Sequence, residues 1–233
     1  MAPARSEAID PAGVVHQDAD LIVLAKPAGL LSVPGRGPDK RDSLLVRATK
    51  RWPDALLVHR LDQATSGLML LARSLLIQRA LSRAFAERRV DKRYQAIVHG
   101  LVSAPRTADG WADIELPLLP DWPNRPRSKV DHQHGKPSHT RWRLLDQDPG
   151  SQTSLLELQP ITGRSHQLRV HLLALGHPVV GDRLYQPDDQ APRLMLHATG
   201  LEFTHPGSGQ GLSLHHLAPF GFAHERPSVT VRA

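Results

Sequence analysis

Short apolar runs separated by turn residues limit the possible folds of this chain more than any other feature of its sequence. The runs alternate or are rich in β-branched residues, as strands are, and clusters of Gly, Pro, Asp and Ser lie between them. Strands are predicted over residues 20–27, 56–58, 68–72, 92–100, 140–148, 154–160 and 192–203. Helices are predicted over residues 42–52, 74–89 and 165–175, with Asp42 or Ser43 capping the first and Ser165 the last.

Strands and helices do not alternate regularly along the chain, which argues against a doubly wound sheet. The pattern favours an α+β fold with a mixed, largely antiparallel sheet and flanking helices. A chain of 233 residues is long enough to bury one sizeable core. We expect a loose tail at residues 1–13, one domain over residues 14–222 with a loop-rich excursion at 104–137, and a second tail at 223–233.

Basic residues outnumber acidic ones, 29 to 23, and give a formal net charge of +6. Most of them are arginines, whose planar guanidinium group binds phosphate and stacks on bases. The excess is consistent with a nucleic acid partner, and equally with a solvated basic surface.

The chain contains no cysteine, which excludes disulfides, thiolate metal sites and cysteine nucleophiles. The absence of cysteine is typical of a reducing compartment, so a cytoplasmic location is expected. No apolar run approaches the roughly 20 residues that a membrane-spanning helix needs. We therefore expect no membrane partner.

The stretch HRLDQATSG (residues 59–67) places charge between two apolar runs, LLV and LMLLA. In an extended segment, side chains two positions apart share a face, so Arg60 and Asp62 project together. A buried carboxylate is expensive unless it is paired or takes part in function. A structural ion pair with a turn-capping aspartate is the alternative to a functional site.

A second polar stretch, ITGRSHQLR (residues 161–169), follows a predicted strand and opens a predicted helix. With Ser165 as the cap, the amide groups at the helix start would form an anion site, and Arg164 would lie beside it. An ordinary basic turn with a capping serine explains the same residues without a ligand.

Other sequence signals are weaker. Tyr94 lies in a predicted strand, where an aromatic residue is usually part of the core unless a flat ligand stacks on it. The 14 histidines show no HExxH pattern, so no metal site is predicted. The chain also lacks a GxxxxGK[ST] loop, a GxGxxG turn after a strand and a G-x-S-x-G elbow, so no nucleotide cofactor is expected.

Five stretches resemble segments of the RluA-type pseudouridine synthases, which isomerise uridine in RNA. HRLDQATSGLMLLA is similar to the family signature HRLDxxTSGLxLxA. The other stretches are DLIVLAKPAGLLSVPG, KRYQAIVHG and LQPITGRSHQLRVHLLALGHPVVGDRLY, and LMLHATGLEFTHP resembles the closing strand. The resemblance runs from about residue 16 to residue 220 and implies the family's catalytic domain, with a deep cleft for RNA.

The resemblance implies roles for several residues. Asp62 would be the essential carboxylate, acting at the sugar C1′, at the base C6 or on the 2′ proton. Arg164 would pair with Asp62 and keep it ionised. Tyr94 would stack on the uracil, and its hydroxyl would take part in the proton transfer at C5. A leucine of the closing strand, Leu194 or Leu196, would pack on the base.

The resemblance also implies how the RNA is held. Arg60 would enter the RNA stack where the target base has left. Arg125, Arg127 and Lys129 are candidates for phosphate contacts, and so are Lys26, Arg79 and Arg83, although a solvated surface explains any single one of them. The reaction is an isomerisation and needs no cofactor.

Within the family the resemblance is greatest to the A-type subgroup, because DWPNRPRSKV is similar to its central loop and no room is left for an N-terminal S4 domain. That subgroup acts on a 23S rRNA stem-loop and a tRNA anticodon stem-loop, so structured RNA is the expected partner of a monomeric enzyme. Two alternatives stay open. One is an RNA-binding chaperone with little catalysis, and the other is a carboxylate enzyme such as an inverting glycosidase, which would need a second carboxylate near Asp62.

Overall fold

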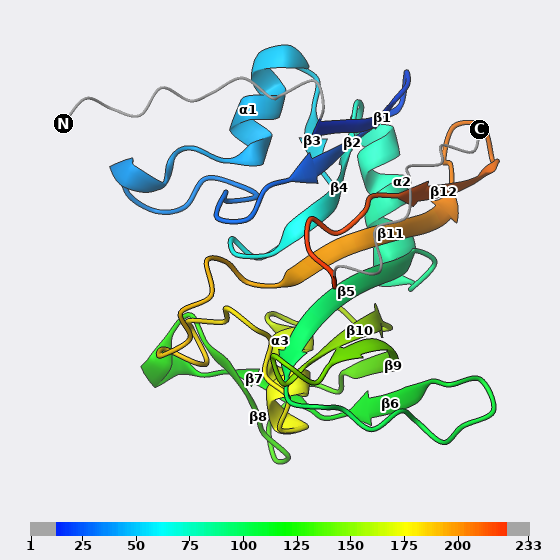
Figure 1. Ribbon diagram of the computed structural model, residues 1–233. Helices are drawn as coiled ribbons and strands as arrows, with labels where there is room; N and C mark the ends of the chain where they lie inside the picture. The colour runs from blue at the N-terminus through cyan, green and yellow to red at the C-terminus, as the bar shows by residue number, and fades with distance from the viewer. Residues whose placement is uncertain (1–12, 223–233) are drawn as a thin grey trace.

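The computed structural model describes residues 13–222, and one large mixed sheet runs through them (Figure 1). Its strands are β1 (Val14–Gln17), β2 (Leu21–Lys26), β3 (Leu56–Leu57), β4 (Ser66–Ala72), β5 (Asp91–His99), β6 (Ala112–Glu115), β9 (His139–Asp148), β10 (Thr153–Pro160), β11 (Leu196–Thr204) and β12 (Gly211–His215). The order is β1-β2-β4-β11-β5-β10-β9-β6, with β3 on β4 and β12 on β11. The tails predicted at residues 1–13 and 223–233 lie, except for residue 13, outside the described part of the chain.

The pair β4–β11 is parallel, and the other pairs of named strands in the described chain are antiparallel. At this pair Gly67 lies against Ala198 so closely that a Cβ on residue 67 would come within 2.3 Å of the Ala198 carbonyl oxygen. Gly67 also has a φ of 114°, which side chains rarely adopt. The glycine of the TSG turn is therefore required where the two halves of the sheet meet.

Strands β2 and β4 are buried on both faces, as continuous apolar runs in a sheet are. One face, with Leu21, Val23, Leu68 and Leu70, packs on helix α2 (Leu75–Ala86). The opposite face, with Ile22, Leu24, Met69 and Leu71, packs on helix α1 (Leu44–Arg51). Helix α3 (Gln167–Ala174) covers the other half of the sheet through Leu168 and Leu172, which pack among residues of β5, β9 and β10.

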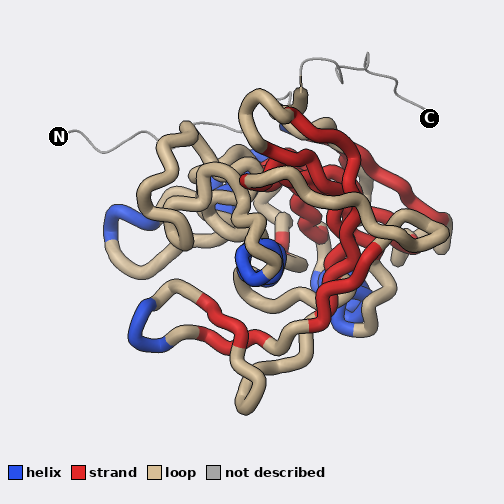
Figure 2. The backbone as a smooth tube through the Cα atoms, turned by 60° about the horizontal axis from the view of Figure 1, so that its bottom comes forward, coloured by secondary structure: helices blue, strands red, loops and turns tan. Residues whose placement is uncertain are grey.

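A two-stranded hairpin, β7 (Leu118–Pro120) and β8 (Ser128–Val130), lies apart from the large sheet (Figure 2). Its loop contains the 3₁₀ turn η3 (Trp122–Asn124), and a second 3₁₀ turn, η2 (Pro38–Lys40), precedes α1. The hairpin and β6 fall in the segment that the sequence predicts to be loop-rich, because their runs are too short for the periodicity of a strand to be read.

The α+β class and the mostly antiparallel sheet are confirmed, and so are the predicted strands, with small shifts at their ends. Ser43 and Ser74 accept hydrogen bonds from the third helical residue of α1 and α2, so Ser43 rather than Asp42 is the cap. The cap predicted at Ser165 is wrong: α3 begins at Gln167, after His166 in the left-handed region with φ of 55°. Within residues 13–222 no helix combines the length and apolar character needed to span a membrane.

Candidate active site

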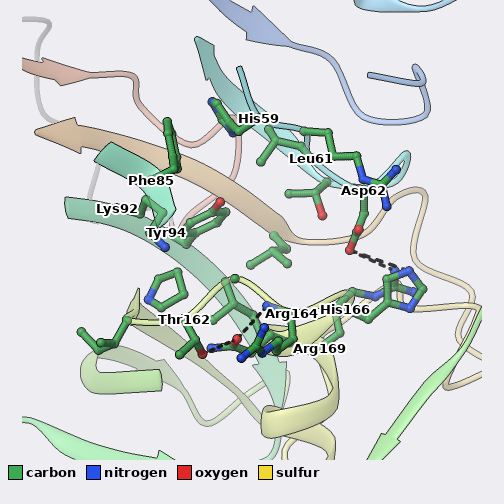
Figure 3. Close-up of a pocket in the computed structure, with 18 of the residues that line it drawn as sticks. His59, Leu61, Asp62, Phe85, Lys92, Tyr94, Thr162, Arg164, His166 and Arg169 are labelled. Atoms are coloured by element: carbon green, nitrogen blue, oxygen red, sulfur yellow. Dashed lines mark hydrogen bonds and ion pairs between the residues drawn. The ribbon is translucent and has the colours of Figure 1, made fainter. Parts of the chain in front are cut away.

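A cleft of about 480 Å³ opens between the segment after β3, the end of α2, β5 and the start of α3 (Figure 3). It is lined by both polar stretches singled out in the sequence and by Tyr94. Arg60 is exposed, Leu61 is buried and Asp62 is partly exposed, which is the alternation of an extended segment. Residues from Asp62 to Arg169 along the chain thus converge on one cavity.

The backbone around Asp62 is fixed from several sides. The Ser32 hydroxyl donates to the Leu61 carbonyl at 2.6 Å and accepts from the Leu61 amide at 3.0 Å. The Thr65 amide donates to the Asp62 carbonyl at 3.1 Å, which closes the turn. These bonds place the carboxylate without using its oxygens, so the oxygens remain available in the cleft.

Lys26 is part of this support and does not contact phosphate, so that expectation is wrong. Its side chain is 1% exposed, and its ammonium group donates to the carbonyls of Pro27, Leu30 and Gln63. Burial lowers the pKa of Lys26 to about 7, against the opposing attraction of Asp62. The lysine joins the loop after β2 to the residue that follows Asp62.

His59 also has a supporting role. Its Nε2 accepts a hydrogen bond from the Leu70 amide at 3.0 Å, and its ring stacks on Phe85 with centroids 4.6 Å apart. Burial lowers the pKa of His59 to about 3, so the imidazole is neutral and acts as an acceptor. This histidine holds the start of the HRLD segment against β4 and α2.

The ion pair predicted between Arg164 and Asp62 is replaced by one with Arg169. Arg169 Nη1 lies 3.6 Å from Asp62 Oδ2, whereas the exposed Arg164 donates through Nε to the Pro137 carbonyl at 3.3 Å. Arg169 in turn makes a bidentate bond to Asp182, at 2.7 and 2.6 Å. The side chains of Arg169 and Asp182 are 5% and 2% exposed, and that of Asp62 is 30% exposed. Arg169 therefore connects a carboxylate in the core, Asp182, to one in the cleft, Asp62.

His166 and Tyr185 form the other side of this arrangement. His166 Nε2 lies 3.9 Å from Asp62 Oδ2, and its Nδ1 is 2.9 Å from the Tyr185 hydroxyl. The same hydroxyl accepts from the Ser128 amide at 2.8 Å and lies 3.2 Å from the Ser128 carbonyl. Because Ser128 begins β8, a short chain of contacts joins the hairpin to Asp62.

Helix α3 is held in place by Gln167 rather than by a serine cap. The Gln167 side-chain oxygen accepts from the Thr162 hydroxyl at 2.7 Å and from the Arg164 amide at 3.0 Å. Its side-chain nitrogen donates to the His139 carbonyl and the Thr140 hydroxyl. The Arg164 amide is therefore occupied within the protein, and the anion site expected at the helix start is not formed by it.

Tyr94 and Leu196 line the cleft together with Asp62. Burial, with the charge of Asp62, raises the pKa of the Tyr94 hydroxyl, so the phenol is held in its protonated form. Of the two leucines left open by the sequence, Leu196 lines this cleft, and Leu194 lines a smaller pocket behind it with Arg169 and Asp182. The cleft thus offers a ring and an apolar side chain beside a carboxylate.

The other predicted RNA contacts lie outside the cleft. Arg125 and Lys129 are exposed on the hairpin, Arg127 is partly buried, and Arg79 and Arg83 are exposed on α2. The Arg125 guanidinium stacks on Trp122, whose side chain is 64% exposed, and Lys129 lies 3.5 Å from Asp131. The hairpin therefore presents an exposed aromatic ring among cations, which suits a single-stranded base and its phosphates.

Sequence reasoning did not assign Arg169, Asp182, His166 or Tyr185 to the site. All four lie in one stretch quoted for the resemblance, residues 158–185, and for His166 and Arg169 proximity in sequence to Arg164 was the available signal. Asp182 follows a glycine turn and shows its role only when the fold brings it against α3.

Known proteins with similar sequences and structures bear on this cleft. Residues 20–174 match the family described as RNA pseudouridylate synthase. The dual-specificity RNA pseudouridine synthase RluA of Escherichia coli K12 is 46% identical over 210 residues, covering 89% of this chain and 93% of that protein. RluA of Vibrio vulnificus is 46% identical over 201 residues, covering 84% and 78%.

Solved structures agree with the sequences. Human RNA pseudouridylate synthase domain containing 1 superposes with a TM-score of 0.75 at 30% identity, covering 94% of this chain and 87% of that one. Human RNA pseudouridylate synthase domain containing 4 gives 0.68 at 26% identity, covering 89% of each chain. The chain therefore belongs to the RluA type of RNA pseudouridine synthases.

Proposed function

We propose that this enzyme isomerises uridine in both a 23S rRNA stem-loop and a tRNA anticodon stem-loop, with Asp62 as the essential carboxylate. The proposal rests on the 46% identity to dual-specificity relatives over nearly their whole length, together with the placement of Asp62 in the cleft. A cytoplasmic location and a monomeric enzyme are also part of the proposal.

The reaction breaks the bond between N1 and C1′, turns the uracil and joins C5 to C1′. C5 then loses its proton and N1 gains one, so the product is an isomer of the substrate. Asp62 faces the cleft with its oxygens free of backbone hydrogen bonds among those described, and Arg169 and His166 flank it. Arg169 lies 3.6 Å from the carboxylate and is itself balanced by Asp182, so its charge is shared between two carboxylates.

Tyr94 and Leu196 hold the uracil while it is detached from the sugar. A ring and an apolar side chain make flat, undirected contacts, which permit the base to rotate without breaking hydrogen bonds. Because the raised pKa of Tyr94 disfavours a phenolate, stacking is its main contribution, and a role in the C5 proton transfer falls to its neutral hydroxyl. Arg164 lies at the rim of the cleft and is proposed to contact the RNA backbone.

Arg60 is proposed to fill the gap that the target base leaves. It lines the cleft, is exposed, and forms no hydrogen bond or ion pair with another side chain described in residues 13–222. Extruding a base costs a few kcal/mol, and a guanidinium plane that stacks in its place offsets part of this. The hairpin cations Arg125, Arg127 and Lys129 are proposed to bind phosphates of the stem.

The test is release of tritium from 5-tritiated uridine in a 23S rRNA stem-loop, a tRNA anticodon stem-loop and an unstructured oligonucleotide. We expect the protein to release tritium from both stem-loops, and the Asp62→Asn variant to lose about 10⁴-fold or more in turnover while it still binds both RNAs. Turnover by Asp62→Asn at the wild-type rate would rule out the carboxylate role. Pseudouridine mapping in a deletion strain then shows whether one RNA or both lose the modification.

A further inference from the structure

A second charged group faces the cleft, far from Asp62, and the chemistry above does not use it. Lys92 lies on β5 two residues before Tyr94, so both side chains point to the same side of the strand and both line the cleft. Figure 3 shows Lys92 beside Tyr94 and well away from Asp62. Its ammonium group forms no hydrogen bond or ion pair with any residue in the described range 13–222.

Arg88 lines the same end of the cleft and is equally without a side-chain partner in that range. It directly follows the last turn of α2 with a φ of 59°, a left-handed conformation that favours glycine at the end of a helix. An arginine in this position carries backbone strain, and strained residues gather at sites that bind ligands. The chain thus keeps a cation where the backbone alone would prefer glycine.

Neither neighbouring carboxylate, Glu87 or Asp91, forms an ion pair with Lys92 or Arg88 within residues 13–222. Glu87 is bound by Arg89 at 2.6 and 2.8 Å, and Asp91 accepts a hydrogen bond from Gln159 at 3.3 Å. The charged groups that act on Lys92 are Asp91, which stabilises its charge, and Arg88, which opposes it, and His59 is a neutral neighbour. Burial lowers the pKa of Lys92 to about 8, with Asp91 opposing this shift and Arg88 adding to it.

We propose that Lys92 and Arg88 form a subsite of the cleft that binds one phosphate of the RNA strand carrying the target uridine. Two adjacent cations that repel each other in the free protein gain the most from an anion placed between them. The phosphodiester is the anion that an RNA substrate supplies, so this subsite rests on the proposed function. It fixes the backbone at one end of the cleft while Asp62 meets the sugar at the other.

The sign of the pH dependence follows from the lowered pKa. Below about pH 8 Lys92 is protonated in the free protein and binds the phosphate fully, and bound phosphate raises its pKa again. Above that pH, binding requires uptake of a proton, so RNA affinity falls by about tenfold between pH 7 and pH 9. An arginine at position 92 stays charged, so Lys92→Arg is expected to bind RNA with no such fall.

The experiment measures RNA binding by the Asp62→Asn protein, called the parent, because this protein binds the RNA without converting the target uridine. Each phosphate near the target uridine is replaced in turn by an uncharged methylphosphonate. At one position we expect the affinity of the parent to fall about tenfold or more, and that of Lys92→Met, which keeps only the Arg88 contact, to fall clearly less. Lys92→Met should also reduce the slope of log affinity against log salt by about 1, and Lys92→Arg should keep the parent slope.

The second variant, Arg88→Gly, guards against a folding defect, since glycine suits a φ of 59° and the protein should unfold at the same or a higher temperature. Arg88→Gly is expected to bind unmodified RNA more weakly than the parent, and to lose less affinity than the parent when the same phosphate is replaced by methylphosphonate. Equal losses in parent and Lys92→Met at every position, or an unchanged salt slope, would overturn the subsite. Absence of tritium release by the wild type from any RNA would instead overturn the proposed function and leave the binding result standing.

Discussion

The Asp62 end of the cleft and the β7–β8 hairpin differ in how their charged groups are held. At the Asp62 end the carboxylates are paired: Asp62 faces Arg169, and Arg169 is bound by the buried Asp182. On the hairpin the cations are mostly exposed and stack on aromatic rings or lie near one aspartate. The paired charges of the first region fix the positions of its side chains, whereas the exposed cations of the second are available to bind the phosphates of RNA. Changes in the first should therefore act on stability and turnover, and changes in the second on salt-dependent binding.

The largest effect is expected from Arg169→Met. The substitution leaves the buried Asp182 without its bidentate partner, which should lower the free energy of unfolding by about 3–5 kcal/mol. Arg164→Met is the matched control, since Arg164 is exposed and should change stability by less than about 0.5 kcal/mol. Urea unfolding of the two variants decides the point, and a larger loss in Arg164→Met would reinstate that residue as the partner of Asp62.

A smaller effect, confined to structured RNA, is expected from Arg60→Ala. Without the guanidinium plane the gap in the stack is unfilled, so kcat/KM on a stem-loop should fall by about 10–100-fold. An unstructured oligonucleotide has no stack to repair and should be affected much less. Arg60→Lys keeps the charge but not the plane and should resemble Arg60→Ala. Similar losses on both RNAs would show that Arg60 does not act in base flipping.

On the hairpin, Arg125→Gln with Arg127→Gln should weaken RNA binding at low salt without changing kcat. If each arginine binds one phosphate, the slope of log affinity against log salt falls by about 2. Arg106→Gln, an exposed arginine in the connection from β5 to β6, serves as the control and should leave the slope unchanged. A fall in kcat with an unchanged slope would mean that the hairpin acts on the chemistry instead.

The contact between the two regions can be broken by Tyr185→Phe. The variant keeps the ring next to Arg169 and loses the hydroxyl that joins His166 to Ser128. The expected loss of stability is about 0.5–1.5 kcal/mol, and the Ser128 amide should exchange its hydrogen faster. Unchanged exchange at Ser128 would show that the hydroxyl does not restrain the hairpin.

Sequence patterns predicted the large strands and the class of the fold because these strands are buried on one or both faces and their side chains repeat that burial. Asp62 and Tyr94 were predicted through the family motifs, and both line one cleft in the fold. The resemblance assigned Arg164 as the partner of Asp62, and the predicted cap at Ser165 was consistent with that assignment. His166 adopts a left-handed conformation instead, the helix begins at Gln167, and Arg169 is turned toward Asp62. The start of the helix is shifted by one residue, which rotates the side chains that follow, and neither composition nor residue spacing predicts such a shift.

Lys26 and Lys92 show a related limit. Both are lysines near motif residues, yet one is buried among three carbonyl groups and the other faces the cleft without a partner. Two of the carbonyls around Lys26 belong to the turn directly after it, and the third, that of Gln63, comes from a distant segment that the sequence does not place there.

The position of β11 between β4 and β5 also determines when the cleft can form during synthesis of the chain. During synthesis the segments bearing Asp62 and Tyr94 leave the ribosome long before Leu196 and Ala198, which join the two halves of the sheet. Until then β4 and β5 each lack a neighbour along one edge, and the cleft has no common floor. The nascent chain therefore cannot bind its RNA in the finished geometry while most of it is already made, and exposed strand edges at this stage are where a chaperone would be needed.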